Sequence, residues 1–362
     1  MKYKSSFKIR DREISIDAPT YFIADIAANH DGDLARAKDL IWRAKEAGSD
    51  AVKFQHFRAE KIVSDFGFKN LGQQASHQAG WKSSVFDTFR KYEFNREWNE
   101  ALATEAKKAS IHFMTTPYDT EAVEEIDHLV PAYKIGSGDI TWTDFISYVA
   151  KKKKPMVIAC GASNLDEVKR GVAAALEFNE ELALLQCNTN YTGKIENFRF
   201  VNLQVIKSLA KAFPNLVLGL SDHTPGHATV LGAIALGGRV IEKHFTDDNS
   251  REGPDHPFSM NPKSWREMVD RSRELEASMG DGIKRVEENE LETVVLQRRS
   301  LRLKADSAAG AVILAQELEA LRPAPVDSIP PSAIREVAGQ KLLKNKVAGD
   351  YLRWSDLGKE EQ

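Results

Sequence analysis

Short apolar runs alternate with longer amphipathic segments along residues 21–279. The runs that predict strands are 21–27, 51–55, 111–116, 132–136, 155–160, 182–187, 216–220 and 239–245. The segments with helical spacing lie at 33–48, 95–110, 120–126, 142–151, from 164 onward, 200–213, 227–236 and 262–279. Runs that are apolar throughout are typical of parallel strands covered by helices on both faces.

Eight strand–helix units in about 250 residues predict an α/β protein built on a (β/α)8 TIM barrel. A doubly wound open sheet is the alternative, but it rarely needs eight units, and no Gly-x-Gly-x-x-Gly turn follows a strand. Local signals support the helices, because Asp33 can cap one of them and Asn164 with Glu167 forms a capping box for another.

Three regions lie outside this repeat. We expect a hairpin over residues 7–16 before it, and a mostly irregular stretch over 56–94 with one short helix near 85–90. Beyond residue 281 the chain becomes polar, and then short apolar runs alternate with prolines, which predicts a small β-rich domain. The predicted boundaries are 1–282 for the barrel, 283–293 for a linker and 294–362 for the second domain.

Composition narrows the classes of partner. The 362 residues have a formal net charge of -3, so the chain lacks the excess of positive charge that is typical of proteins binding nucleic acid or an anionic membrane. No apolar run approaches the roughly 18 residues of a spanning helix, and the N-terminus lacks a signal core. Cys160 and Cys187 lie in apolar runs, so we interpret them as small buried hydrophobes rather than a disulfide. We therefore expect a cytoplasmic protein without a nucleic-acid or membrane partner.

Two apolar runs end in a histidine that follows a second polar residue. Ser221 and His223 are two positions apart, as are Glu242 and His244, so each pair points to one side of its strand. Two imidazoles on adjacent strand ends could hold a divalent metal. The alternative is that all four are satisfied polar residues at strand termini.

Other polar residues follow the same strand ends, where barrel enzymes have their active sites. These candidates are Asp25, Lys53, Gln55, Thr116, Lys134, Ser137, Asp139, Asn190 and Tyr191. A lysine inside an apolar strand is costly unless it is paired, so Lys53 and Lys134 either meet structural carboxylates or await an anionic substrate. We favour an anionic substrate, because the lysines, the hydroxyl groups and a metal would lie together at the C-terminal end of the barrel. Asp25, Asp139 and Asp255 can bind sugar hydroxyls or move protons. Together these residues predict a metal-assisted carbon–carbon bond-forming or bond-cleaving enzyme.

Several motifs resemble one family, in order and over nearly the whole chain. Residues 23–33, 47–55, 134–139, 219–224 and 241–246, followed by Gly253-Pro-Asp255, resemble the sialic acid synthase (N-acetylneuraminate synthase) family. Residues 290–357 resemble its C-terminal antifreeze-like (SAF) domain.

The resemblance implies that phosphoenolpyruvate condenses with N-acetylmannosamine or a related 2,4-diacetamido sugar, giving a nine-carbon 2-keto acid and phosphate. The family's metal ligands match His223 and His244, and manganese is the expected ion, with magnesium or cobalt as alternatives. Its phosphoenolpyruvate contacts match Lys53, Thr116, Lys134, Ser137 and Ser221. Its sugar contacts match Gln55, Tyr191, Asp255 and, from the second domain of a partner in a domain-swapped homodimer, Arg322. Asp139 and Glu242 are the proton-transfer candidates.

The sequence departs from the family at four places. Asp25 stands where the family usually has glutamate, and Asp139 stands where some members have glutamate. Ala159-Cys160-Gly161 stands where many members have Ser-Thr-Gly, which removes a hydroxyl expected to contact phosphoenolpyruvate. The loop 188–200 is longer than the usual Tyr-Pro version. These changes make legionaminic acid, or another related product, an alternative to sialic acid.

Other functions stay open at this point. A related synthase that uses a phosphorylated aldose would need further basic residues, for which His77, Lys82 and Arg90 are available. A non-catalytic glycan- or ice-binding protein would leave the lysines and histidines unexplained. A metallohydrolase would need a third strong ligand, and Asp222 points away from His223 if the strand alternates regularly.

Overall fold

The computed structural model describes residues 2–71, 78 and 81–358. The chain forms two compact units, Met1–Met279 and Gly280–Gln362. The division lies three residues before the boundary that the sequence suggested, and α13 (Leu291–Gln297) begins inside the segment expected to be a linker.

The first unit is a closed barrel of eight parallel strands, as predicted from the apolar runs. Strand β10 pairs with β9 on one side and with β3 on the other, which closes the sheet. The strands are β3 (Tyr21–Asp25), β4 (Ala51–His56), β5 (His112–Pro117), β6 (Tyr133–Ile135), β7 (Met156–Ala159), β8 (Leu182–Cys187), β9 (Val217–Asp222) and β10 (Gly238–His244).

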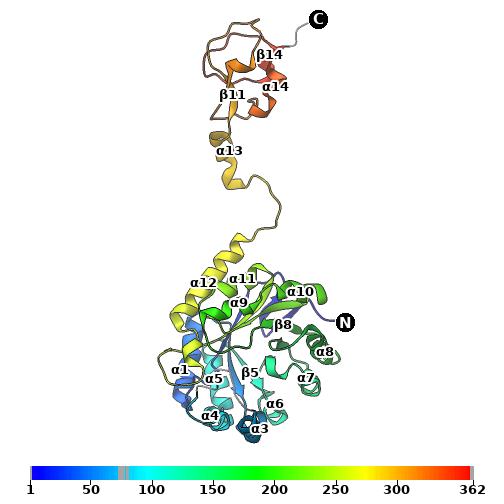
Figure 1. Ribbon diagram of the computed structural model, residues 1–362, viewed down its shortest axis with the longest axis vertical. Coiled ribbons are helices and arrows are strands. Elements are labelled where there is room, and N and C mark those ends of the chain that lie inside the picture. Colours follow the sequence, from blue (N-terminus) through cyan, green and yellow to red (C-terminus); the bar gives the residue numbers. More distant parts are fainter. Residues whose placement is uncertain (1, 72–77, 79–80, 359–362) are drawn as a thin grey trace. The chain divides into compact units, whose positions relative to one another are not determined.

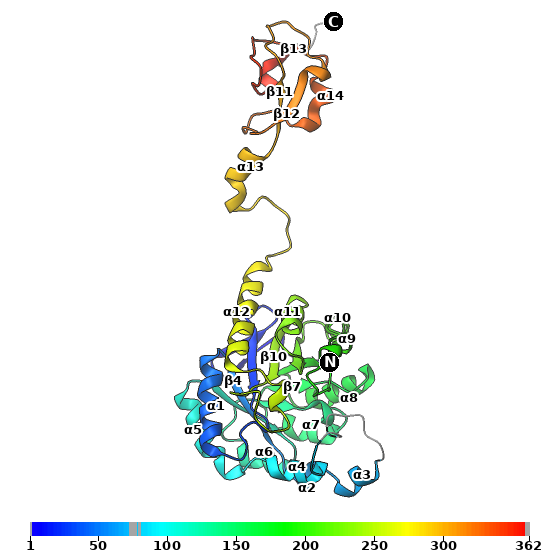
Figure 2. The ribbon, with the colours of Figure 1, turned by 60° about the vertical axis from the view of Figure 1, so that its left-hand side comes forward.

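Helices surround these strands in both ribbon views (Figures 1 and 2). The main ones are α1 (Leu34–Glu46), α5 (Asn99–Lys108), α6 (Thr120–Ile126), α7 (Thr143–Ala150), α8 (Leu165–Leu176), α10 (Val205–Ala212), α11 (Ala228–Ala235) and α12 (Pro262–Ser278). The Asp33 carboxylate accepts hydrogen bonds from the first turn of α1, and Asn164 with Glu167 forms the capping box of α8. Both capping predictions are confirmed.

Two expectations about helices were wrong. The stretch 56–94 contains α2 (Ala59–Ile62) and α3 (Asp65–Asn70) in addition to α4 (Val85–Tyr92). Helices of four and six residues are too short to show a clear apolar period. The single helix expected at 200–213 is broken, because α9 (Phe198–Val201) ends at a residue with φ of 49°. That residue, Asn202, is of a type that tolerates the left-handed conformation.

The barrel unit has two apolar layers. One lies between the strands and the surrounding helices, and the other fills the barrel interior. The N-terminal hairpin, β1 (Ser6–Ile9) with β2 (Arg12–Ser15), contributes Phe7, Ile9 and Ile14 to the interior layer, where they join residues from the first positions of the strands. The hairpin therefore closes the N-terminal end of the barrel, and only the opposite end is left for a site.

The second unit is small and contains two antiparallel strand pairs. Strand β11 (Ser300–Leu303) pairs with β12 (Leu318–Leu321), and β13 (Lys341–Leu342) pairs with β14 (Leu357–Gly358). Its own core includes Leu301, Leu303 and Ile313. These features fit the expected β-rich domain, and its antifreeze-like identity stays a prediction.

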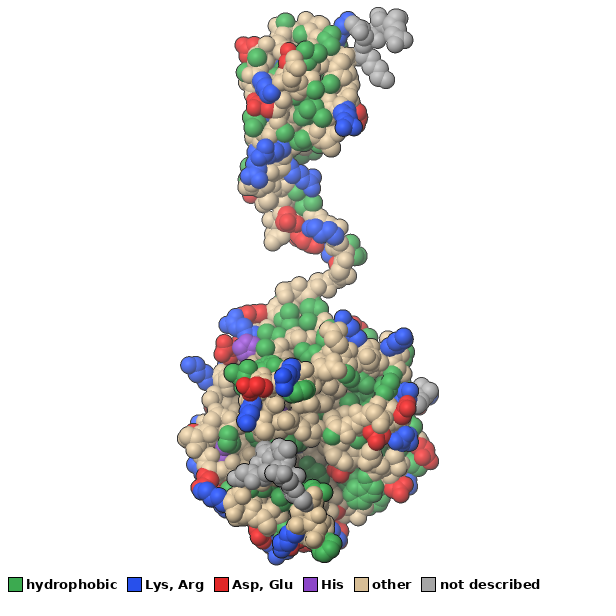
Figure 3. Space-filling view, in the orientation of Figure 1, with side chains coloured by type: hydrophobic (Ala, Val, Ile, Leu, Met, Phe, Trp, Pro, Cys, Tyr) green, Lys and Arg blue, Asp and Glu red, His purple; other side chains and the backbone are tan. Residues whose placement is uncertain are grey.

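Two surface properties complete the fold. On the face of the barrel unit seen in Figure 3, basic and acidic side chains are interspersed rather than gathered into one patch. Within the described parts of the chain, no helix combines the length and apolar character needed to cross a bilayer.

Cys160 and Cys187 are both buried and free of a disulfide, as expected.

Candidate active site

Strands β9 and β10 place alternate residues on opposite faces. Ser221 lies beside Glu242 in the sheet, and the Ser221 hydroxyl donates to Glu242 Oε1 at 3.1 Å. The next pair in the register, Asp222 and Lys243, forms its own contact on the other face. The alternation predicted for Asp222 and His223 is therefore confirmed, and the inward residues face the C-terminal mouth of the barrel.

The first buried lysine, Lys53 on β4, is only 1% exposed. Its Nζ lies 2.8 Å from Asp25 Oδ2 and donates to Thr116 Oγ1 at 2.8 Å. The Gln55 amide also donates to Asp25 Oδ2, at 2.8 Å. Burial alone would raise the pKa of Asp25, but the Lys53 ammonium and His244 outweigh burial and hold that pKa below its ordinary value.

The second buried lysine, Lys134 on β6, is 3% exposed, and its Nζ lies 3.1 Å from Glu242 Oε1. Burial raises the pKa of Glu242, but the Lys134 and Lys53 ammonium groups lower it by more, so the pKa lies below its ordinary value. Both lysines therefore meet carboxylates, which was one of the two alternatives for them, because a buried ammonium without a partner is costly. Their binding of an anionic substrate stays a prediction. The pairing is incomplete, however, since Glu242 Oε2 is buried without a hydrogen-bond partner.

The two predicted metal ligands lie side by side. Nδ1 of His223 is 3.1 Å from the carbonyl oxygen of Asn188, and the ring centroids of His223 and His244 are 5.4 Å apart. Nδ1 of His244 is buried without a hydrogen-bond partner, and it lies 3.9 Å from Asp255 Oδ2. Burial, with smaller contributions from His223 and Lys53, lowers the pKa of His244 to about 3. His244 is therefore neutral at pH 7, as a metal ligand must be.

These two imidazoles fit a divalent ion. With metal–nitrogen bonds of about 2.1 Å, two rings on one ion lie roughly 5 Å apart between centroids. The Nδ1 contact of His223 with a backbone carbonyl is the type of second contact that orients a metal-bound histidine. The described residues contain no ready-made cluster of three or more ligating side chains. An ion here would therefore complete its coordination with water or substrate oxygen.

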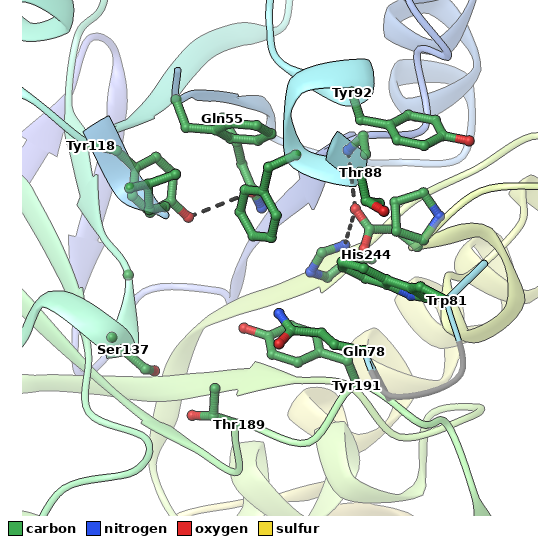
Figure 4. Close-up of a pocket in the computed structure, with 18 residues that line it drawn as sticks. Gln55, Gln78, Trp81, Thr88, Tyr92, Tyr118, Ser137, Thr189, Tyr191 and His244 are labelled. Atoms are coloured by element: carbon green, nitrogen blue, oxygen red, sulfur yellow. Dashed lines mark hydrogen bonds and ion pairs between the residues drawn. The ribbon is translucent and has the colours of Figure 1, made fainter. Parts of the chain in front are cut away.

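A cavity of about 270 Å³ opens at this end of the barrel. Figure 4 shows Trp81, Thr88 and Tyr92 on one side of it, with Ser137 and Thr189 on the opposite side. Its described lining comprises Ala28, Gln55, Phe57, Ile62, Gln78, Trp81, Thr88, Phe89, Tyr92, Tyr118, Gly136, Ser137, Gly138, Thr189, Tyr191, His244, Pro254 and Asp255.

Five of the residues predicted from the sequence line this cavity: Gln55, Ser137, Tyr191, His244 and Asp255. The predicted residues that are buried outside its lining are Asp25, Lys53, Thr116, Lys134, Ser221, His223 and Glu242. The site therefore has two parts, an open cavity and an adjoining charged cluster that is closed to solvent in this structure.

Two predicted residues, Asn190 and Arg322, lie outside both parts of the site. The Asn190 side chain is exposed and accepts hydrogen bonds from Thr192 and Asn197 within its own loop, so it does not line the cavity. Arg322 belongs to the second unit, where its Nε donates to the carbonyl oxygen of Gln297. Its predicted role at a partner's barrel stays a prediction.

Two of the basic residues considered for a phosphorylated aldose lie outside the described cavity lining. Lys82 lies 3.2 Å from Glu252, and the guanidinium of Arg90 lies over the Phe86 ring. The third, His77, lies outside the described residues.

Asp139 follows β6 and differs from the paired carboxylates. Burial raises the pKa of Asp139 to about 6, and the nearby Lys134 ammonium only partly offsets this. A carboxyl that titrates near neutral pH is suited to proton transfer.

Sequence reasoning missed two members of the site. Tyr118 is half-buried in the cavity lining, and its hydroxyl donates to Gln55 Oε1 at 3.5 Å. Its position just after β5 was the available signal. Cys187 was interpreted only as a small hydrophobe, yet its thiol hydrogen-bonds His223. Burial raises the pKa of this thiol, but the contact with His223 outweighs burial and lowers it overall.

Comparison with known proteins places the chain among carbohydrate-acid synthases. Residues 40–284 match the NeuB family. The chain is 36% identical over 343 residues to the N,N'-diacetyllegionaminic acid synthase of Legionella pneumophila, covering 93% of this chain and 94% of that protein. It is 32% identical over 326 residues to the human N-acetylneuraminate-9-phosphate synthase, covering 90% and 89%.

A solved structure extends the similarity to the fold. The spore coat polysaccharide biosynthesis protein SpsE from Bacillus subtilis aligns with a TM-score of 0.64 and 28% identity, and the alignment covers 98% of this chain and 100% of that one.

Proposed function

Because the chain belongs to the NeuB family, we propose that it is a nonulosonic acid synthase that condenses phosphoenolpyruvate with the open-chain form of an N-acyl hexosamine. The product is a nine-carbon 2-keto sugar acid, and inorganic phosphate is released. The names of the relatives support this class of reaction, since they make legionaminic acid and N-acetylneuraminate 9-phosphate.

The observation that carries the proposal is the convergence of two buried lysines on one barrel mouth. Lys53 and Lys134 are 1% and 3% exposed, and hydroxyl groups of Thr116, Ser137 and Ser221 belong to the same strand ends. Ammonium and hydroxyl donors in a low-dielectric site suit a small ligand that carries both a carboxylate and a phosphate. Phosphoenolpyruvate is such a ligand, and it would compete with Asp25 and Glu242 for the lysines.

His223 and His244 would hold a divalent ion, which when bound supplies polarisation of the aldehyde oxygen. The donor set of two imidazoles with oxygen co-ligands is compatible with manganese, magnesium or cobalt. In the reaction, carbon 3 of phosphoenolpyruvate bonds to the aldehyde carbon, and the aldehyde oxygen takes up a proton. Lys53 and Lys134 hold the phosphate and carboxylate in place during this step.

Positive charge then develops at carbon 2, where water adds and loses a proton. The bond between carbon 2 and the phosphate oxygen then breaks while the carbon-2 hydroxyl gives its proton to the departing phosphate, which leaves the ketone and inorganic phosphate. Asp139 is the favoured acceptor of the water proton, because its pKa of about 6 lies closest to neutral pH. Glu242 is the alternative, since one of its oxygens has no partner.

The test is phosphate release from phosphoenolpyruvate with N-acetylmannosamine and manganese, before and after chelation. The wild type should release phosphate only when sugar and metal are both present. His223→Ala should reduce this release by at least a thousandfold, because one of two protein ligands is lost. His128→Ala is a matched control, since His128 is a surface residue beside Glu100. Unchanged release by His223→Ala with metal bound would refute the metal assignment.

A further inference from the structure

We propose that Asp31 is a positioning residue, which holds Asp255 at the barrel mouth through the side chain of His256 although Asp31 is not in the described cavity lining. This inference rests on the proposed function and on the prediction that Asp255 contacts the acceptor sugar. It concerns how that contact is held in place, and it leaves the identity of the sugar open. We name the pair of Asp31 and His256 the brace.

Asp255 lies in the loop 246–260, which follows β10. The two ends of this loop are joined at the end of the strand. The N–H of Met260 donates to the carbonyl oxygen of His244 at 2.9 Å, and the N–H of Thr246 donates to the carbonyl oxygen of Met260 at 2.9 Å. Asp255 lies between these ends, so its place at the cavity depends on the contacts that the loop makes with the rest of the barrel unit.

The loop 26–33, between β3 and α1, supplies contacts on both sides of Asp255. The N–H of Ala28 donates to Asp255 Oδ2 at 3.1 Å. Nδ2 of Asn29 donates to the Ser259 hydroxyl at 2.9 Å, and this hydroxyl donates to the carbonyl oxygen of Asp255 at 2.6 Å. Both the carboxylate and the backbone of Asp255 are therefore tied to one neighbouring loop.

The brace fixes the next residue along the chain. His256 is 0% exposed, and its Nε2 lies 2.9 Å from Asp31 Oδ1 while its Nδ1 lies 2.7 Å from Thr246 Oγ1. Nε2 faces a carboxylate and therefore carries a hydrogen. The chain passes close to this ring, because a Cβ atom at Gly253 would lie 2.6 Å from His256 Cδ2. A buried imidazole held at both nitrogens gives the backbone at Asp255 one position.

Asp31 is itself held by two cations. Nε of Arg251 donates to Asp31 Oδ2 at 2.9 Å, and Nε of Arg36 lies 3.2 Å from the same oxygen. The Arg36 guanidinium also donates to Asp247. Burial raises the pKa of Asp31, but the hydrogen bonds from His256 and Arg251 outweigh burial, so this pKa lies below its ordinary value. Asp31 is therefore an anion at neutral pH with a fixed orientation, as an anchor must be.

The brace matters to the reaction because of where it holds Asp255. Oδ2 of Asp255 lies 3.9 Å from Nδ1 of His244, and both side chains line the cavity. A sugar whose aldehyde lies near His244 can contact Asp255 at the same time only while this spacing is kept. A misplacement of about 1 Å in such an arrangement can cost about a hundredfold in rate.

The experiment measures two KM values, for phosphoenolpyruvate and for N-acetylmannosamine, or for the 2,4-diacetamido sugar if only that one reacts. The full chain with manganese is used throughout. Asp31→Ala should raise the KM for the sugar at least tenfold, while the KM for phosphoenolpyruvate changes less than twofold. His256→Asn should do the same, because its side chain is too short to reach Asp31. His256→Gln should recover most of the loss, since its amide nitrogen can take the place of Nε2.

A double-mutant cycle tests whether Asp31 acts through Asp255. Asp255→Ala should itself raise the KM for the sugar, and the addition of Asp31→Ala should then raise it less than twofold further. Effects that multiply in the double variant would mean that Asp31 does not act through Asp255, and they would overturn the inference.

Asp50→Ala is the matched control for a loss of stability. Asp50 is half-buried like Asp31 but lies before β4, at the opposite end of the barrel. It accepts a hydrogen bond from the N–H of Phe22 at 2.8 Å and lies 3.6 Å from Arg12. Its removal should lower the free energy of unfolding and leave both KM values within twofold of the wild type.

A second variant keeps the test decisive if Asp31→Ala does not fold. Ser259→Ala removes only the hydroxyl that bonds the carbonyl oxygen of Asp255, and it should raise the KM for the sugar at least threefold. Ser272→Ala is its control, because Ser272 is also buried and its hydroxyl has no hydrogen-bond partner in the described part of the chain.

The outcomes separate the two proposals. An unchanged KM for the sugar in the Asp31, His256 and Ser259 variants, or equal increases in both KM values, would overturn the inference and leave the proposed synthase reaction standing. No phosphate release with either sugar, from folded and metal-loaded wild type, would overturn the proposed function and the inference with it.

Discussion

The two faces of β9 and β10 carry buried ionic groups of the same kinds, but only one face satisfies them. On the outward face, Lys243 contacts Asp222 and donates to the carbonyl oxygen of Thr224 at 2.6 Å. The Asp222 carboxylate also accepts hydrogen bonds from the hydroxyls of Thr224 and Thr229. On the inward face, Glu242 pairs with Lys134 but leaves Oε2 without a hydrogen-bond partner, and Nδ1 of His244 also lacks one.

This difference separates a structural pair from a site. A buried polar group without a partner costs free energy, so an orphaned atom in a native fold calls for an explanation. The outward pair needs no ligand, because the protein supplies every contact. The inward cluster has spare acceptors at the barrel mouth, which a bound ion, water or substrate would use. Residues one position apart on a strand thus serve different purposes.

The largest expected effect comes from breaking the inward pair. Lys134→Met should lower kcat/KM for phosphate release by at least a thousandfold, or about 4 kcal/mol of transition-state stabilisation, because a cation that holds phosphoenolpyruvate is lost. Steady-state kinetics measures this loss. The free energy of unfolding should fall less than for the outward pair, since Lys53 also acts on Glu242. Near-normal kcat/KM in this variant would remove Lys134 from the reaction.

The same substitution on the outward face should act on stability instead. Lys243→Met leaves Asp222 buried without a cation, and losing one member of such a pair costs about 3–5 kcal/mol. Denaturant unfolding measures this loss. The protein that remains folded should keep a kcat within about threefold of the wild type. A large fall in kcat with unchanged stability would mean that the outward pair belongs to the site.

The sequence predicted which face of the strand each side chain lies on better than it predicted which side chains pair. Alternation along a strand is a local property, so Ser221 and Glu242 could be assigned to one side and Asp222 to the other. The eight strands were predictable because their signal is local too: a buried parallel strand is a short run of apolar residues. The pairing of Lys134 with Glu242 joins β6 to β10, which are not neighbours in the sheet, and no local pattern shows which side chains of distant strands meet.

The cavity was the least predictable part. Phe57 and Phe89 belong to a stretch that was expected to be mostly irregular, and its helices are too short for a clear period. Asn190 was chosen because it follows a strand, but the conformation of its loop turns its amide toward Thr192 and Asn197. Strand ends can be located from sequence, whereas the direction of loop side chains depends on tertiary contacts.

The smallest expected effect is a change in pH dependence at Asp139, a third kind of carboxyl at this mouth. Burial raises the pKa of Asp139 to about 6, so a proton-accepting Asp139 should lower kcat/KM about tenfold for each pH unit below 6. The second pKa of a phosphate ester is also near 6, so the substrate could produce the same limb. Asp139→Asn separates the two, because a limb that comes from the substrate persists in this variant. Asp144→Asn, an exposed carboxyl on α7, is the matched control.

The same group gives a stability test with a defined sign. Because the pKa of Asp139 is higher in the folded protein than its ordinary value of 3.8, its burial penalty is absent below about pH 4 and grows as pH rises through about 6. Asp139→Asn should therefore unfold at a similar denaturant concentration at pH 4 and at a higher one than the wild type at pH 7. A variant less stable than the wild type at pH 7 would mean that the ionised carboxylate is stabilised by partners, as in the outward pair. Asp139 would then belong with Asp222 rather than with the residues that await a substrate.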